Sequence, residues 1–139
     1  MANAGILGEM QIPEEIDAEE WRRVFATNVD GVFHCCIAAY PVMKENKRGK
    51  VIIMSSVSSG LLCFFSLDEN VRCETGSSHT LAAFSSSKGA VIPLARSLAV
   101  AWAKSNIQVN CILPGAVDTD FNVPLMVPAF FESFGGVCG

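Results

Sequence analysis

Two short, mostly apolar runs, 51–54 and 107–113, alternate with two long stretches of helical periodicity, 19–43 and 82–103. Apolar runs of this length, closed by serines or by a Pro-Gly pair, are typical of parallel strands covered on both faces. Parallel strands need a long crossover connection, which is usually a helix. The alternation therefore predicts an α/β fold with a partial, doubly wound parallel sheet and flanking helices.

The first helical stretch begins with a capping signal. Asp17 is followed three residues later by Glu20, a pair that can satisfy the unpaired N–H groups of a helix start reciprocally. Apolar residues then recur at spacings of three and four on one broad stripe, which we expect to be buried. This stripe consists of Trp21, Val24, Phe25, Val29, Val32, Phe33, Cys36, Ile37 and Tyr40.

The second helical stretch also has one apolar face, and it contains a proline. Because Pro93 lacks a backbone N–H, we expect it to kink the helix. The apolar face consists of Val91, Leu94, Ala95, Leu98 and Trp102. Residues 61–80 have no clean period and predict a long surface loop, and residues 121–139 predict a lid-like or irregular tail.

Length and charge limit the classes of protein that the chain can belong to. Its 139 residues, half of them apolar, suffice for one core but not two. The net charge of −4 and the scattered basic residues do not indicate a nucleic-acid partner. No apolar run is long enough to span a bilayer, and no signal-like core follows Met1. We expect a single cytoplasmic domain over residues 1–139, without a membrane partner.

The six cysteines form no CxxC pair and have no histidine at metal-ligand spacing. No metal site is therefore predicted, and reduced thiols are the simplest interpretation. Cys35 and Cys36 should lie on different sides of the first helix, and Cys111 in a strand. The remaining three are Cys63, Cys73 and Cys138.

Four short motifs and one lysine follow one another in an order that is known from one enzyme family. They are the turn Asn3-Ala4-Gly5, the helix with Asn28, the run 49–56 that ends in Ser55-Ser56, Lys88, and the segment 114–119. Together they resemble the C-terminal, catalytic half of the short-chain dehydrogenase/reductase family, over roughly residues 3–120. The resemblance implies a Rossmann-like sheet in a family member that is truncated at both ends, with residues 61–80 as an inserted loop.

The resemblance also implies functional roles. Ser56 would hold the substrate oxygen, Lys88 would bind the ribose hydroxyls of the cofactor, and Asn28 would hold a water molecule against Lys88. The cofactor would be NAD or NADP, and the substrate a secondary alcohol or ketone. Besides Lys88, the implied cofactor contacts are Asn3, Ala4, Gly5, Pro114, Gly115, Val117 and Thr119.

Phe84 stands four residues before Lys88, where the family has its catalytic tyrosine. A phenyl ring has no hydroxyl, so Phe84 cannot give a proton to a carbonyl or take one from an alcohol. No glycine-rich, phosphate-binding turn precedes Asn3. We therefore expect an NAD(P)-dependent oxidoreductase that binds its cofactor weakly and whose activity is impaired.

Two alternatives remain open. The chain can be a non-catalytic partner that binds a full-length relative through its two long helices, which in the family pack against neighbouring subunits. It can also be an incomplete gene product. In each case the unpaired sheet edge beside 51–54 or 107–113 favours oligomers. His34, His79 and Tyr40 are interpreted as helix-surface, loop and packing residues, respectively.

Overall fold

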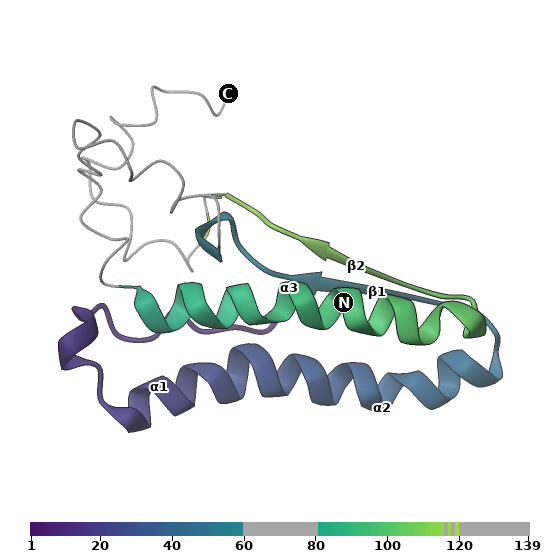
Figure 1. Cartoon of the computed structure of the whole chain (residues 1–139), viewed down its shortest axis with the longest axis horizontal. Helices are drawn as coiled ribbons and strands as arrows, with labels where there is room; N and C mark the ends of the chain where they lie inside the picture. The colour runs from purple at the N-terminus through teal and green to yellow at the C-terminus, as the bar shows by residue number, and fades with distance from the viewer. Residues whose placement is uncertain (60–80, 116, 118, 120–139) are drawn as a thin grey trace.

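The computed structural model describes residues 1–59, 81–115, 117 and 119, so the predictions for residues 61–80 and 121–139 lie outside the described residues. Two parallel strands and three helices dominate the described part (Figure 1). The helices are α1 (Ala18–Phe25), α2 (Gly31–Glu45) and α3 (Ala82–Trp102), and the strands are β1 (Gly49–Met54) and β2 (Ile107–Ile112). A π-helical turn, Ala26–Asp30, joins α1 to α2, and short 3₁₀ turns span Pro13–Glu15, Val57–Ser59 and Ala103–Ser105.

Strands β1 and β2 pair in parallel, from Gly49 opposite Ile107 to Met54 opposite Ile112. On the other side of β1, the N-terminal segment adds a single parallel bridge at Ala2. There the Ala2 N–H donates to the Ile52 carbonyl at 2.8 Å, and the Ala2 carbonyl accepts from the Met54 N–H at 3.1 Å. The predicted α/β class and the parallel pairing are confirmed.

The core lies between one face of this sheet and helices α2 and α3 (Figure 1). Side chains alternate along a strand, so the odd-numbered residues of both strands point to this core. The even-numbered residues are exposed or half-buried, and no described helix covers them. The prediction that both faces are covered is therefore wrong for the described residues. The buried core consists of Val32, Cys36, Val51, Ile53, Val91, Ala95, Leu98, Trp102, Ile107 and Val109.

The predicted N-cap at Asp17 is confirmed. The predicted return hydrogen bond, from the Asp17 N–H to the Glu20 carboxylate, is wrong. One carboxylate oxygen of Asp17 accepts from the N–H groups of Glu19 and Glu20, at 2.8 and 2.7 Å. The Glu20 carboxylate does not return to Asp17. It accepts instead from the Glu9 N–H at 2.7 Å and from the Arg23 guanidinium at 2.6 and 2.8 Å. The Arg23 guanidinium and the Glu9 N–H therefore occupy the Glu20 carboxylate in place of the Asp17 N–H.

The apolar stripe of the first helical stretch is only partly buried. Val24 is fully buried, whereas Trp21, Phe33 and Ile37 are 39–44% exposed. A broad stripe needs neighbours over its whole width, and within the described residues the sheet and α3 cover only part of it. Tyr40 packs as predicted, with its ring 4.7 Å from that of Trp102.

Several smaller features of the described residues complete the fold. Helix α3 runs through Pro93 without interruption. Cys35 is exposed, Cys36 is buried and Cys111 is half-buried, and all three are free thiols. In the described part of the chain, no helix has the length and hydrophobicity to cross a bilayer. That part also holds no cluster of His, Cys, Asp or Glu that could bind a metal ion.

Candidate active site

Lys88 is buried at the face of α3 that turns toward the sheet. Only 6% of the residue is exposed. Its ammonium group donates a hydrogen bond of 2.9 Å to the carbonyl of Met54, at the end of β1, and lies 5.7 Å from the ring centroid of Phe84. Within the described residues the only ion pair joins Arg23 to Glu20, so no described carboxylate neutralises this cation. Burial accordingly lowers the pKa of Lys88.

Asn28 lies on the π-helical turn and is fully buried. Its amide group donates to the carbonyl of Ile6 at 2.9 Å and to the hydroxyl of Ser87 at 3.0 Å. Its carbonyl oxygen accepts from the Ile6 N–H at 2.8 Å. A π-helical turn inserts an extra residue into a helix and is often found at functional sites. Here the turn lets one side chain tie the N-terminal segment to α3.

Ser87 also belongs to this cluster, although it is not among the residues predicted from the sequence. It is fully buried, and its hydroxyl donates to the carbonyl of Phe84 at 2.7 Å while it accepts from Asn28. Ser87 lies on the buried face of α3 that also carries Phe84 and Val91, at spacings of three and four. This position on an otherwise apolar face was the signal that could have revealed it.

The turn formed by Asn3, Ala4 and Gly5 passes close to both of these polar groups. A Cβ atom at Gly5 would lie 3.2 Å from the Lys88 ammonium and 3.3 Å from the Asn28 carbonyl oxygen. Asn3 and Ala4 are exposed. The structure therefore brings Gly5, Asn28 and Lys88 together, and glycine leaves the space that these side chains occupy.

Ser55 and Ser56 at the end of β1 have different partners. Ser55 is buried, and its hydroxyl donates to the Lys88 carbonyl at 2.7 Å, which anchors α3 to the strand. Ser56 is half-buried and accepts from the N–H and the hydroxyl of Ser58, at 3.2 and 2.9 Å. Within the described residues these two bonds leave the Ser56 proton for another acceptor. No hydrogen bond in that part of the chain joins Ser56 to Lys88 or Asn28.

The segment that follows β2 is attached to the loop that carries Ser56. The Val57 N–H donates to the Pro114 carbonyl at 3.0 Å. Beyond this contact, Gly115, Val117 and Thr119 are exposed, and the Thr119 hydroxyl donates to the Val117 carbonyl at 3.4 Å. These residues lie at the carboxyl ends of β1 and β2, where open parallel sheets bind their ligands.

The described residues fit one half of a nicotinamide dinucleotide. An ammonium has three donors, and among the described residues Lys88 uses one of them for the Met54 carbonyl. Gly5 approaches this ammonium so closely that a Cβ there would lie 3.2 Å from it. The printed sequence contains no G-x-G-x-x-G motif, the turn that binds the pyrophosphate half in Rossmann folds. The described helices also include none that follows a strand and a glycine-rich turn.

The sequence matches the family described as short chain dehydrogenase over residues 1–65 and 70–126. These segments contain the parallel strand pair, the buried lysine and the serine at the strand end. The chain therefore belongs to the short-chain dehydrogenase family, and the resemblance inferred from its motifs is confirmed.

Individual relatives are considerably longer than this chain. A chloroplastic tropinone reductase homolog from Arabidopsis thaliana is 40% identical over 105 residues, which cover 76% of this chain and 28% of the relative. The 3-oxoacyl-[acyl-carrier-protein] reductase FabG from Aggregatibacter actinomycetemcomitans is 35% identical over 136 residues, which cover 91% of this chain and 50% of the relative. The chain thus spans half or less of the length of these relatives.

Solved structures that resemble this chain are also longer than it. A gluconate 5-dehydrogenase from Burkholderia cenocepacia in complex with NADP and tartrate superposes with a TM-score of 0.77 at 28% identity, covering 95% of this chain and 46% of that one. A 3-ketoacyl-(acyl-carrier-protein) reductase from Brucella melitensis with NADH superposes with a TM-score of 0.78 at 26% identity, covering 95% and 50%. The cofactor that the family implies, NAD or NADP, is the one that these solved relatives contain.

Proposed function

We propose that this chain carries the catalytic half of an NAD(P)-dependent oxidoreductase that acts on a secondary alcohol or ketone, and that Phe84 impairs its proton transfer. The observation that carries this proposal is the position of Lys88. A buried ammonium without a described carboxylate partner is costly unless it has a function. This one lies beside the Phe84 ring and next to Gly5 and Asn28.

Each residue of the site has a separate task in the proposed reaction. When bound, the cofactor would supply or accept the hydride. Ser56 would donate its free proton in a hydrogen bond to the substrate oxygen, on which negative charge develops. Lys88 would hold the ribose hydroxyls with its two remaining donors. Asn28 acts as a positioning residue, because it holds the N-terminal turn and α3 in register through Ile6 and Ser87.

The proton-transfer step is where this chain departs from its family. Phe84 contributes an apolar ring but no acid or base. General acid catalysis is typically worth about 10²–10⁴-fold in rate, or roughly 3–5 kcal/mol of barrier. Water would then have to serve as the acid. We propose that carbonyl reduction by the chain is slow for this reason, and slower still because the pyrophosphate half of the cofactor has no cradle.

The test is the substitution Phe84→Tyr, assayed on a panel of ketones with NADH and NADPH. We expect only a small gain in the chain itself, because a poorly held nicotinamide limits the rate. When the N-terminal half of a full-length relative is supplied by fusion or co-expression, the same substitution should raise kcat/KM by about 10²–10⁴-fold. The double variant Phe84→Tyr, Lys88→Met serves as the matched control and should lose this gain. Rapid ketone reduction by the unmodified chain would refute the assignment of Phe84.

A second candidate function is supported by the exposed apolar side chains of the helices. Phe33 and Ile37 on α2 are 42% and 44% exposed, and Val100 on α3 is 80% exposed. A non-catalytic protein could use these exposed side chains to bind a full-length relative of its own family. Co-purification of such a relative with the wild type, but not with Phe33→Lys, would support this candidate.

The exposed thiol of Cys35 agrees with the reducing cytoplasm that we propose as the location.

A further inference from the structure

Lys88 is held to the end of β1 at two points. Its ammonium donates to the carbonyl of Met54 at 2.9 Å, and its backbone carbonyl accepts from the hydroxyl of Ser55 at 2.7 Å. Met54 and Ser55 are neighbours in the sequence, so the two bonds and the lysine side chain form a closed loop across the end of the strand. A shift of the Lys88 backbone therefore changes where its ammonium lies.

The proton of the Ser55 hydroxyl is used for this bond. A hydroxyl has one proton to donate. The Ser59 hydroxyl lies 3.3 Å away as a second acceptor, but the Lys88 carbonyl is nearer, at 2.7 Å. Ser59 donates its own proton to the Ser56 carbonyl at 2.6 Å. Ser55 is only 5% exposed, so water is poorly placed to replace its hydroxyl.

Helix α3 has a gap in its own hydrogen bonds next to this contact. Pro93 has no N–H, so the carbonyl of Gly89, four residues earlier, lacks the helical bond that this N–H would make. Lys88, the residue directly before Gly89, is the one that Ser55 attaches to the strand. The turn after β1 also lies close here, because a Cβ atom at Gly89 would be 3.5 Å from the Ser59 carbonyl. Ser55 thus fixes α3 where its own ladder is interrupted.

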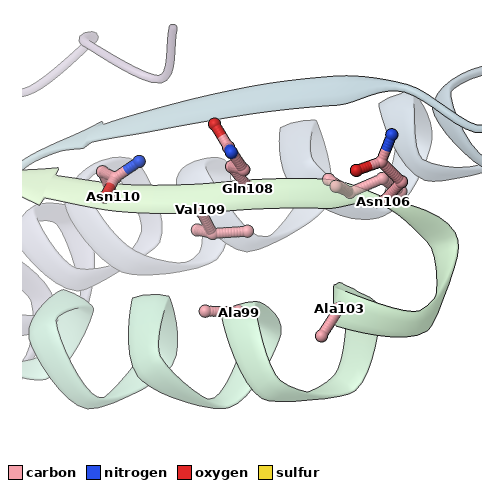
Figure 2. Close-up of a pocket in the computed structure, with 7 residues that line it drawn as sticks. Ala99, Ala103, Asn106, Gln108, Val109 and Asn110 are labelled. Atoms are coloured by element: carbon pink, nitrogen blue, oxygen red, sulfur yellow. The ribbon is translucent and has the colours of Figure 1, made fainter.

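A titratable group on β2 faces the same side of the sheet. Figure 2 shows Val109 pointing toward α3, with Gln108 and Asn110 on the other side of β2. Side chains alternate along a strand, so Cys111, two residues beyond Val109, also points toward α3. Burial raises the pKa of this thiol, and the Lys88 charge opposes that rise. Burial likewise lowers the pKa of Lys88, and among the described residues Cys111 is the titratable group that opposes this change.

We propose that Ser55 is a positioning residue, whose hydroxyl sets how deep the Lys88 ammonium lies at the end of β1 and so presents it to the ribose hydroxyls of the cofactor. The part that concerns the ribose rests on the proposed function, whereas the depth of the ammonium does not. Two consecutive serines thus have separate roles. Ser55 places the lysine, and Ser56 contacts the substrate oxygen.

The first experiment measures the pKa of Lys88 without cofactor, by NMR of protein labelled with ¹³C at the lysine ε-carbon. The chain has five lysines, and Lys88→Met identifies the signal of Lys88. In Ser55→Ala we expect the ammonium to become hydrated, so that its pKa rises toward the ordinary value of 10.5. All variants carry Cys111→Ala, which removes the interacting thiol.

Ser59→Ala is the matched control. It removes a hydrogen bond of similar length from the same turn, but none from Lys88, so the Lys88 pKa should stay unchanged. A residue that only stabilises the turn would give the same result at both positions. The inference is overturned if the Lys88 pKa in Ser55→Ala is unchanged or lower, or if Ser59→Ala raises it as far.

An isosteric pair separates the hydroxyl of Ser55 from the space that it fills. Ser55→Thr keeps the hydroxyl, whereas Ser55→Val has a methyl group in its place and the same shape. The Lys88 pKa should therefore be higher with valine than with threonine. This pair replaces Ser55→Ala if that variant does not fold, and equal values for the two would contradict the inference.

NADH binding tests the part that rests on the proposed function. At millimolar NADH, both Ser55→Ala and Lys88→Met should bind less cofactor than their parent. The double variant should bind no less than Lys88→Met, because both changes remove the same contact. If Lys88→Met binds NADH as well as its parent, the proposed function fails, while the pKa comparison still decides the role of Ser55. If only Lys88→Met weakens binding, the ribose part of the inference is overturned.

Discussion

The side-chain amide of Asn28 donates a hydrogen bond of 3.0 Å to the hydroxyl of Ser87, 59 positions later in the sequence. Both residues are fully buried. Through Ser87 the contact extends to the carbonyl of Phe84, and through Asn28 it extends to the backbone of Ile6. The segment of α3 that carries Phe84 and Lys88 is thus fixed against the N-terminal turn by one connected set of buried hydrogen bonds.

Removing the Ser87 hydroxyl should destabilise the fold. Ser87→Ala leaves a buried donor of Asn28 without its acceptor, which typically costs about 1–3 kcal/mol. The matched control is Ser86→Ala, because Ser86 is the exposed neighbour on the same helix, and we expect a change within about 0.5 kcal/mol. Urea unfolding at one fixed protein concentration measures both. Equal midpoints for the two variants would show that the Asn28–Ser87 bond contributes nothing to stability.

Adding a methyl group at Gly5 should disturb the site directly. The new Cβ would lie 3.2 Å from the Lys88 ammonium and 3.3 Å from the Asn28 oxygen, so one of them has to move. Overpacking of this kind typically costs about 1–3 kcal/mol. Gly115→Ala is the control, since a Cβ there meets no atom within 4 Å. Chemical denaturation of both variants checks this prediction, which fails if Gly5→Ala is as stable as Gly115→Ala.

The buried ammonium of Lys88 should make stability depend on pH. Burial lowers its pKa in the folded chain, while the unfolded side chain titrates near 10.5. Between these two values the unfolded chain binds more protons than the folded chain, so stability should rise with pH up to about 10.5. Lys88→Met should remove this contribution.

Two thiols, the buried Cys36 and the half-buried Cys111, act in the opposite direction. Burial raises the pKa values of Cys36 and Cys111, so their contribution to stability falls as pH rises above about 9. The Lys88 charge also lowers the pKa of Cys111, so the two lysine variants are compared in a Cys111→Ala background. There Cys36 is common to both proteins, and the difference between the two unfolding curves isolates the lysine. If this difference does not change between pH 8 and 10.5, the ammonium is not desolvated in the folded chain.

Cofactor binding should be weak and should depend on Lys88. Because no glycine-rich cradle for the pyrophosphate is encoded in this sequence, fluorescence titration with NADH or NADPH should not saturate at micromolar concentrations. At millimolar concentrations, Lys88→Met should bind less than wild type, while the surface control Lys104→Met should not differ from it. Saturation at micromolar NADH or NADPH would mean that another part of the chain holds the pyrophosphate.

Local patterns were sufficient to predict the helices, the strands and their parallel pairing. The short apolar runs 51–54 and 107–113 form β1 and β2, and the Asp17 cap starts α1. These features depend on residues that are close in sequence. The motifs with Gly5, Asn28 and Lys88 also led to the correct family. A sequence motif, however, could not reveal which polar groups the folded chain would bring into contact.

The tertiary structure decided which surfaces are buried and which partners the polar groups find. Lys88 donates to the Met54 carbonyl from 34 positions away, and Asn28 donates to the Ile6 carbonyl from 22 positions away. The Glu20 carboxylate accepts from the backbone N–H of Glu9 rather than completing a capping box. Trp21, Phe33 and Ile37 have apolar side chains that periodicity assigns to a buried stripe, yet they are partly exposed because the described sheet and α3 cover only part of α1 and α2. Periodicity depends on the chain alone, whereas burial and hydrogen bonding depend on what packs against each face.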